Sequence, residues 1–321
     1  GKAVRTNTMS KIKTVFVAGA TASGKTELAI KLAKRFDGEI VSADSMQIYK
    51  GIHIASAAPD TEEMQGIPHY MLEFLKPDDS FSVAEYVEKA RAYVKDIARR
   101  GKLPIVAGGT GLYINSLADN ISYIEEKNDG KLRRELEERF ENIGAEQMLK
   151  ELKEIDPETA ARLHSNDKKR IIRAFEVYRL TGKTVTEQNK LSKQGDALID
   201  PCIIEITYRD REKLYDRINR RVDKMLQSGL AEEARAALRN TAGGAYQAIG
   251  HKELSGYISG DMSLEEAAEK LKMQTRRYAK RQLTWFRRDE RINRIYADET
   301  EDVFSAAEKI TENFLGTEEA E

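Results

Sequence analysis

The chain has 321 residues, of which 40% are apolar and 33% are charged, a composition typical of globular proteins. Its one cysteine, Cys202, excludes a disulfide framework or a cysteine-based metal site within one chain, and no apolar run approaches the roughly 20 residues that cross a bilayer. We therefore expect a soluble, cytoplasmic protein with no membrane partner. The net charge of -1 does not exclude a nucleic-acid partner, because basic residues are concentrated in the segment 276–294.

The first predicted element is a strand over 14–18, followed by a glycine-bearing loop and a helix with apolar residues at helical spacing. A second buried strand over 39–43 ends at Asp44, and Ser82 with Glu85 predicts a capping box that starts a helix. Further strands are predicted over 103–107 and 202–207. This alternation predicts an α/β fold, a P-loop NTPase-like parallel sheet flanked by helices.

The segment 122–195 shows helical patterns and no strand signal, which predicts a helical insertion domain between two parts of the core, 10–121 and 196–315. Within the insertion, a helix between Asp167 and Gly182 should turn its apolar residues inward. These residues are Ile171, Ile172, Phe175 and Tyr178. The second part of the core should contain a long basic helix from Ser263 to about Asp289, opened by a capping box.

The most specific motif is a phosphate-binding loop that lies between a predicted strand and a predicted helix. It consists of Gly19, Ala20, Thr21, Ala22, Ser23, Gly24, Lys25 and Thr26. The glycines let backbone amides turn inward around a diphosphate or triphosphate, Lys25 neutralises the outer phosphate, and the Thr26 hydroxyl can bind Mg²⁺. The motif leaves open whether the phosphate is transferred, hydrolysed or lost with a leaving group.

Two further polar residues follow predicted strands at the sheet edge where ligands bind in open α/β folds. Asp44 fits three roles: a Mg²⁺ ligand, the base of a small-molecule kinase, or the base for another nucleophile. A turn or cap residue is the structural alternative. Thr110, within the turn at 108–111, can reach the phosphates.

Six motifs occur in order: GATASGKT at 19–26, DSMQIYKG at 44–51, GGTGLY at 108–113, KRIIR at 169–173, QAIGHKE at 247–253 and KRQLTWFR at 280–287. On these motifs the chain resembles the tRNA dimethylallyltransferase family, also called isopentenyl-diphosphate:tRNA transferases, over most of its length. The resemblance is to bacterial members, because the single cysteine excludes the zinc-finger extension of eukaryotic relatives.

The resemblance implies that the P-loop binds the pyrophosphate of dimethylallyl diphosphate, and that ATP is not the physiological ligand. The dimethylallyl group would pass to the exocyclic amine of the adenosine 3′ of the anticodon in tRNA, with release of pyrophosphate. Asp44 would be the general base, while Lys25, Thr110, Arg221 and Mg²⁺ would stabilise the charge on the departing pyrophosphate. We also expect a monomer.

The resemblance also implies an extensive tRNA surface. The expected tRNA contacts are Asp44, Ser45, Met46, Gln47, Thr110, Arg133, Lys169, Arg170, Ile171, Ile172, Arg173, Gln247, Ala248, Ile249, Gly250, His251, Lys252, Lys280, Arg281, Gln282, Leu283, Thr284, Trp285, Phe286 and Arg287. Gln47 would read a base edge, and basic side chains would hold phosphates. Trp285 and Phe286 offer stacking faces or, equally, core packing.

The sequence departs from the family at 55–59, where Ala-Ser-Ala-Ala-Pro replaces a Gly-Thr-Ala-Lys-Pro turn, so we expect no site role for Ala58. Two other functions fit parts of the pattern. A nucleoside or small-metabolite kinase would use the same P-loop with Asp44 as base. A non-enzymatic RNA-binding module would need only the basic helices, but the intact pair Lys25 and Thr26 argues against it.

Overall fold

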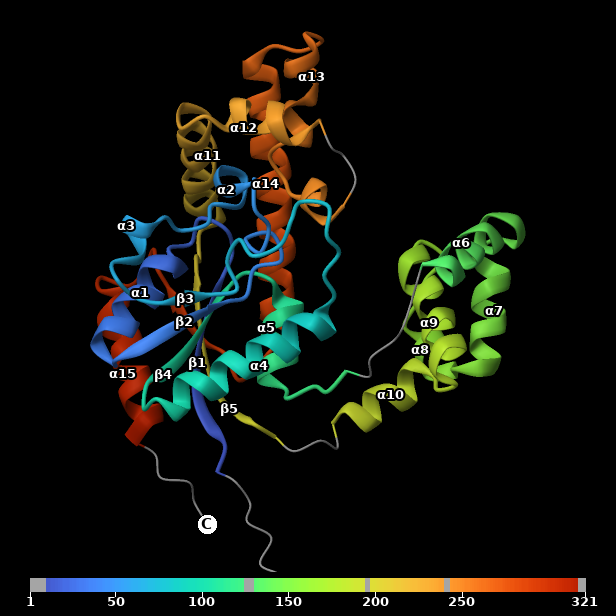
Figure 1. The fold of residues 1–321 in the computed structure, drawn as a ribbon, viewed down its shortest axis with the longest axis horizontal. Coiled ribbons are helices and arrows are strands. Elements are labelled where there is room, and N and C mark those ends of the chain that lie inside the picture. Colours follow the sequence, from blue (N-terminus) through green and yellow to red (C-terminus); the bar gives the residue numbers. More distant parts are fainter. Residues whose placement is uncertain (1–9, 124–129, 194–196, 240–242, 317–321) are drawn as a thin grey trace, which may run out of the picture. The chain divides into compact units, whose positions relative to one another are not determined.

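The computed structural model describes residues 10–123, 130–193, 197–239 and 243–316. It contains a parallel sheet of six strands in the order β3-β2-β4-β1-β5-β6. Figure 1 shows strands β1 to β5 of this sheet with helices packed beside them. The strands are β1 (Ile12–Gly19), β2 (Gly38–Ser42), β3 (His69–Tyr70), β4 (Leu103–Gly108), β5 (Ile199–Thr207) and β6 (Asn293–Tyr296). The predicted fold class, a parallel sheet flanked by helices, is confirmed.

Helices cover both faces of the sheet, so most residues of its central strands are buried. On one face, α1 (Lys25–Arg35) and α15 (Val303–Gly316) pack on Val15, Val17 and Ile204. On the other face lie α4 (Val83–Arg99), α5 (Gly111–Ala118) and the end of α14 (Leu264–Arg287). Register pairs Val15 with Ile105 and with Cys202, so β1 is central and the loop after it is held from both sides.

Both predicted capping boxes are present. The Ser82 hydroxyl accepts a hydrogen bond from the Glu85 amide at the start of α4, and Glu85 reaches back to the Ser82 amide. Ser263 and Glu266 make the same pair of bonds at the start of α14. Each box satisfies amide donors that a helix start leaves without partners, which fixes where these two helices begin.

The two edge strands, β3 and β6, were not predicted from the sequence. β3 has only two residues, and β6 mixes Asn293 and Arg294 with the buried Ile295, so neither gives a clear strand pattern. They form because the neighbouring strands offer backbone partners: Ile40 pairs with His69, and Ile206 with Ile295. Pairing with the neighbouring strand, and not the local sequence, therefore determines where both edge strands form.

The remaining helices beside the sheet are short except for α11 (Arg211–Gln227). They are α2 (His53–Ser56), α3 (Thr61–Met64), α12 (Leu230–Ala237) and α13 (Ser255–Ser259), with 3₁₀ turns over Gly244–Gln247 and Lys252–Leu254. An apolar cluster that includes Val222, Leu230 and Leu271 joins α11, α12 and α14. No helix among the described residues is long and apolar enough to cross a membrane.

The chain divides into two compact units: Gly1–Asp119 with Ala197–Glu321, and Asn120–Asp196. The second unit holds α6 (Lys131–Ile143), α7 (Ala145–Ile155), α8 (Pro157–Ala161), α9 (Lys168–Thr181) and α10 (Val185–Ser192). Its core contains Ile171, Ile172 and Phe175 of α9, as predicted. Tyr178 was expected there and is instead 39% exposed, because Val177 is the buried residue of that turn.

Candidate active site

The P-loop connects β1 to α1 and is shaped by two left-handed residues, Ala22 at φ 62° and Gly24 at φ 96°. Such a turn points successive amides toward one concave side, where an anion binds. Ser23 lies within this turn, and its buried hydroxyl has no hydrogen-bond partner among the described residues. A Cβ at Gly19 would lie 2.5 Å from that hydroxyl oxygen and 2.9 Å from the Ile206 carbonyl oxygen, and the backbone contact favours glycine at the strand end.

Helix α11 supports the P-loop with two arginines one turn apart. Arg217 donates through Nε to the Ala22 carbonyl at 2.8 Å, and Arg221 donates through Nη1 to the Thr21 hydroxyl at 3.1 Å. The pKa of Arg221 is lowered overall, chiefly by burial. The charge of Arg217 also lowers this pKa, whereas the negative charge of Asp44 raises it. The two guanidinium groups lie on one side of α11, as their spacing predicts.

Lys25 is the first residue of α1, and its ammonium donates to the Ala20 carbonyl at 3.2 Å. Burial lowers the pKa of this ammonium to about 8; the charge of Arg221 lowers it further, while that of Asp44 raises it. Two cations, Lys25 and Arg221, therefore lie close together beside one carboxylate. An anionic ligand would relieve their repulsion, which favours a phosphate group at this position.

Asp44 follows β2, and one of its oxygens holds the next turn. Oδ1 accepts from the amides of Met46 and Gln47 at 2.8 and 3.1 Å. The other oxygen, Oδ2, has no hydrogen-bond partner within the described ranges, so it remains available to a substrate. Asp44 thus combines the turn role with a carboxylate oxygen that can accept a proton.

Thr110 brings the turn after β4 against the Asp44 loop. Its hydroxyl accepts from the Ser45 amide at 2.9 Å, and its amide donates to the Ala43 carbonyl at 3.1 Å. The close approach needs glycine at 108, because a Cβ there would overlap the Ala43 carbonyl group. The turns after β2 and β4 therefore form one rigid wall.

We expect Gly108→Ala to lower the free energy of unfolding of the sheet unit by about 1–3 kcal/mol, the range for overpacking a filled site. The added methyl must displace the Ala43 carbonyl, and with it the start of the Asp44 loop. Urea titration followed by circular dichroism measures the loss. Gly316→Ala is the control, since a methyl there meets nothing within 4 Å. Equal stability of the two variants would contradict the close approach.

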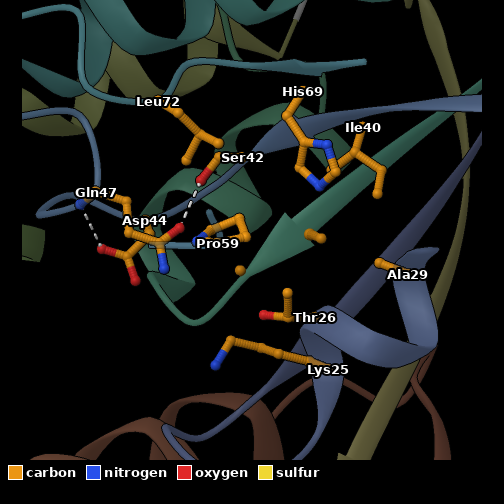
Figure 2. A pocket seen from close by; sticks show the side chains of 12 residues that line it. Lys25, Thr26, Ala29, Ile40, Ser42, Asp44, Gln47, Pro59, His69 and Leu72 are labelled. Carbon is orange, nitrogen blue, oxygen red and sulfur yellow. Dashed lines mark hydrogen bonds between the residues drawn. The ribbon is translucent and has the colours of Figure 1, made fainter. Parts of the chain in front are cut away.

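A cleft joins these groups (Figure 2), and its polar lining includes Lys25, Thr26, Asp44, Gln47 and His69. The apolar part of the lining consists of Ala29, Ile40, Pro59, Leu72 and Ala107. The cleft therefore offers a cationic end and an apolar wall. Burial lowers the pKa of His69, whose Nδ1 lies 2.7 Å from the Ile67 carbonyl, so this side chain adds no positive charge at neutral pH.

The hydroxyl of Thr26 and the carboxylate of Asp44 are hard oxygen donors of the kind that Mg²⁺ prefers. No group of three or more His, Cys, Asp or Glu side chains within the described part of the chain could hold a metal ion. The Thr26 hydroxyl and the Asp44 carboxylate suit Mg²⁺, because this ion commonly takes one or two protein ligands and completes its shell with water and substrate phosphate.

Two residues of α14 complete the site: Gln282, which was expected to contact tRNA, and Tyr278, which was not identified from the sequence. Gln282 is buried and links two loops: its Oε1 accepts from the Thr21 amide at 2.9 Å, and its Nε2 donates to the Gly109 carbonyl at 3.1 Å. Burial and the charge of Asp44 raise the pKa of Tyr278, while hydrogen bonds with Thr110 and Gln282 lower it. Their spacing on one helix did not predict these contacts, because the loops that they contact are far away in the sequence.

The expected tRNA contacts on α14 divide into two faces. Phe286 is fully buried in the sheet core and Gln282 is held by the loops, so both support the helix. The other face is exposed and basic, and it carries Lys280, Arg281, Thr284, Trp285 and Arg287. Trp285 is 41% exposed and packs over Gly111, where a Cβ would overlap its ring. An RNA partner can reach only this second face.

In the segment 247–252, Ala248, Gly250 and His251 are buried, whereas Gln247 is exposed. Lys252 is half-buried and donates to the Gln247 carbonyl at 3.2 Å. The buried residues of this motif pack against the protein, which leaves Gln247, Lys252 and the half-buried Ile249 as the residues a partner can reach.

In the second unit, Lys169, Arg170 and Arg173 lie on the exposed side of α9, opposite the buried Ile171 and Ile172. Three of the predicted contacts have protein partners as well. Arg173 and Arg133 both pair with the buried carboxylate of Glu176, at 3.0 and 3.4 Å. Arg170 lies 3.9 Å from the Asp167 carboxylate but its side chain is 72% exposed. Lys169 and Arg170 are therefore the better candidates for binding an external anion.

Gln47 was expected to read a base through its amide. In the structure its Nε2 donates to the carbonyls of Ser56 and Ala57 at 3.2 and 3.3 Å, and its Oε1 accepts from the Ser42 hydroxyl at 3.2 Å. The side chain therefore ties the Asp44 loop to α2. Ala58, for which no site role was expected, is buried beside it.

A parallel sheet with a P-loop after β1, two arginines bonded to that loop and a carboxylate after β2 is typical of P-loop proteins that bind phosphorylated ligands. Comparison with known proteins gives the family. The model of the IPP transferase family matches residues 47–289, and the chain belongs to this family.

Relatives and solved structures agree with this assignment. A tRNA dimethylallyltransferase of Caldanaerobacter subterraneus subsp. tengcongensis is 46% identical, over 95% of this chain and 98% of its own length. The enzyme of the same name from Acetivibrio thermocellus is 49% identical, over 92% and 94%. A tRNA isopentenylpyrophosphate transferase structure from Staphylococcus epidermidis superimposes with a TM-score of 0.68 at 42% identity, covering 96% of this chain and 100% of its own.

A eukaryotic dimethylallyltransferase, described as acting on tRNA, superimposes with a TM-score of 0.79 at 29% identity. The match covers 95% of this chain and 80% of the eukaryotic one. The predicted family is thus confirmed, and the chain is an enzyme of the prenyltransferase class.

Proposed function

We propose that this enzyme transfers the dimethylallyl group of dimethylallyl diphosphate to the exocyclic amine of the adenosine 3′ of the anticodon in tRNA and releases pyrophosphate. One observation carries the proposal: in a chain of this family, Lys25 and Thr26 share a cleft with Asp44, while Arg221 and Thr110 hold the adjacent loops. The cationic end suits a diphosphate, and the apolar wall suits a short prenyl chain.

The P-loop amides, Lys25 and Arg221 would bind the diphosphate and stabilise the negative charge that develops as the carbon–oxygen bond breaks. Both cations are desolvated before the donor binds, which makes their interaction with phosphate stronger than it would be in water. Mg²⁺, held by Thr26 and the diphosphate, would add positive charge at the leaving group when it is bound.

Asp44 would act on the nucleophile. The adenine amine is weak because its lone pair is delocalised into the ring, so loss of its proton as the new carbon–nitrogen bond forms lowers the barrier. Oδ2 of Asp44 is the atom that would take this proton, since Oδ1 is occupied by the amides of Met46 and Gln47. The bond pair of the broken carbon–oxygen bond leaves with pyrophosphate.

The direct test is incubation of the protein with labelled dimethylallyl diphosphate, Mg²⁺ and unmodified tRNA, followed by nucleoside analysis. We expect one labelled adenosine per acceptor tRNA and release of pyrophosphate. Family membership does not favour the kinase alternative. If ATP bound much more tightly than dimethylallyl diphosphate in calorimetry, and its γ-phosphate were turned over, the proposal would fail.

A second prediction concerns the exposed basic residues of α9. Lys169→Ala combined with Arg170→Ala should weaken tRNA binding and reduce the slope of log affinity against log salt by about 1–2, because fewer counterions are released. Affinity for the donor should not change. Filter binding across a salt titration measures both slopes.

The control is Arg179→Ala with Lys183→Ala, which removes two exposed cations elsewhere in the same unit. Arg173 is kept, because its loss would leave the buried Glu176 with less compensation. An identical salt slope in the test and control variants would remove Lys169 and Arg170 from the RNA surface.

A further inference from the structure

Glu233 lies on α12, and its carboxylate makes three hydrogen bonds inside the protein. Oε2 accepts from the Ile54 amide at 2.7 Å, and Oε1 accepts from the Ala55 amide at 3.0 Å. The third partner is Nε2 of His251, at 2.6 Å from Oε1. The His251 side chain is 3% exposed and that of Glu233 is 13% exposed, so these bonds are shielded from water.

Burial raises the pKa of Glu233, but the hydrogen bonds from His251, Ile54 and Ala55 outweigh this effect and lower it overall. Glu233 is therefore ionised at neutral pH, and each of its bonds to α2 is charge-assisted. Gly250 makes a second contact with α2. It approaches the helix so closely that a Cβ at position 250 would lie 2.9 Å from the Ala55 Cβ.

The other end of α2 is bonded to the Asp44 loop. Gln47 donates to the carbonyls of Ser56 and Ala57 through its side chain and to Asp44 Oδ1 through its amide. A continuous chain of hydrogen bonds thus runs from His251 and Glu233, through α2 and Gln47, to the carboxylate beside the P-loop.

We infer that Glu233 and His251 are positioning residues, which fix α2 and, through Gln47, place the Asp44 carboxylate for the transfer reaction. This inference rests on the proposed function, because the reaction that the two residues would affect is the proposed dimethylallyl transfer. It also gives the buried histidine of the motif at 247–253 a role other than contact with RNA. The donor phosphates bind at a different place, on Lys25 and the P-loop, so donor binding should not depend on this pair.

The prediction separates kcat from donor binding. Glu233→Ala and His251→Leu should each lower kcat by on the order of ten- to a hundredfold, the effect of a small misplacement at the reacting groups. The KM for dimethylallyl diphosphate should stay within about twofold, because the lost interaction does not touch the donor. His251→Gln keeps an N–H donor toward Glu233 and should restore most of the activity.

Glu232→Gln is the matched control, because Glu232 is the exposed neighbour of Glu233 on the same helix. Hydrogen–deuterium exchange of the full chain provides a readout that needs no activity. We expect faster exchange in the peptide over 52–58 for Glu233→Ala and His251→Leu, and unchanged exchange in the peptides of β1 and α1.

Two results would overturn the inference. One is wild-type kcat in Glu233→Ala, and the other is accelerated exchange throughout the sheet unit with a parallel rise in donor KM, which would indicate a general loss of stability. If the wild-type protein transferred no dimethylallyl group, the proposed function would fail. The exchange of the peptide over 52–58 would still decide whether Glu233 and His251 hold α2.

Discussion

Asp44→Asn should slow transfer to tRNA by roughly two to four orders of magnitude, the range for loss of a general base. The substitution is well suited to this residue, because asparagine retains an oxygen that can accept from the amides of Met46 and Gln47. The loop should therefore keep its conformation while the proton acceptor is lost. Single-turnover transfer with saturating donor and tRNA measures the effect on the chemical step.

Binding should separate this interpretation from a structural one. Dissociation constants for dimethylallyl diphosphate and for tRNA should stay close to those of the wild type, since the asparagine side chain would fill the same space as the aspartate it replaces. Asp216→Asn, at an exposed position of α11, is the control for loss of one negative charge. Unimpaired single-turnover transfer by Asp44→Asn would rule out the base assignment.

The parts of the fold that the sequence predicted are those with a strong local pattern. The strands β1, β2, β4 and β5 each contain consecutive buried apolar residues, and two helices begin at the capping boxes of Ser82 and Ser263. The family was also predictable, because six ordered motifs carry it. Edge strands such as β6 depend on a neighbouring strand and have little pattern of their own.

The arrangement of the candidate site was only partly predictable, for the same physical reason. The P-loop and Asp44 are marked by local motifs. Gln282, by contrast, bonds to Thr21 across 261 positions of sequence, and Glu233 bonds to Ile54 across 179. Such contacts exist only once the chain has folded. Nor could the sequence show that the side chains of Gln47 and His251 are occupied by internal hydrogen bonds.

Lys25→Ala should weaken binding of dimethylallyl diphosphate by roughly 10- to 100-fold, which corresponds to loss of a hydrogen bond to a charged group of about 1.5–3 kcal/mol. The ammonium belongs to the first residue of α1, interacts with the charge of Arg221 and lines the cleft. Isothermal titration with the donor and with inorganic pyrophosphate measures the loss for both ligands. Lys31→Ala, an exposed position of α1 that pairs with Glu27, is the control.

The pH dependence provides a second, independent test of Lys25. In the free protein the pKa of this ammonium is lowered to about 8, first by burial and then by the charge of Arg221. The protonated form binds the diphosphate, so the donor affinity of the wild type should be highest below that pKa and should fall as the pH rises through it. Lys25→Ala should lack this fall. If both proteins lost affinity equally above pH 8, a group other than Lys25 would be responsible.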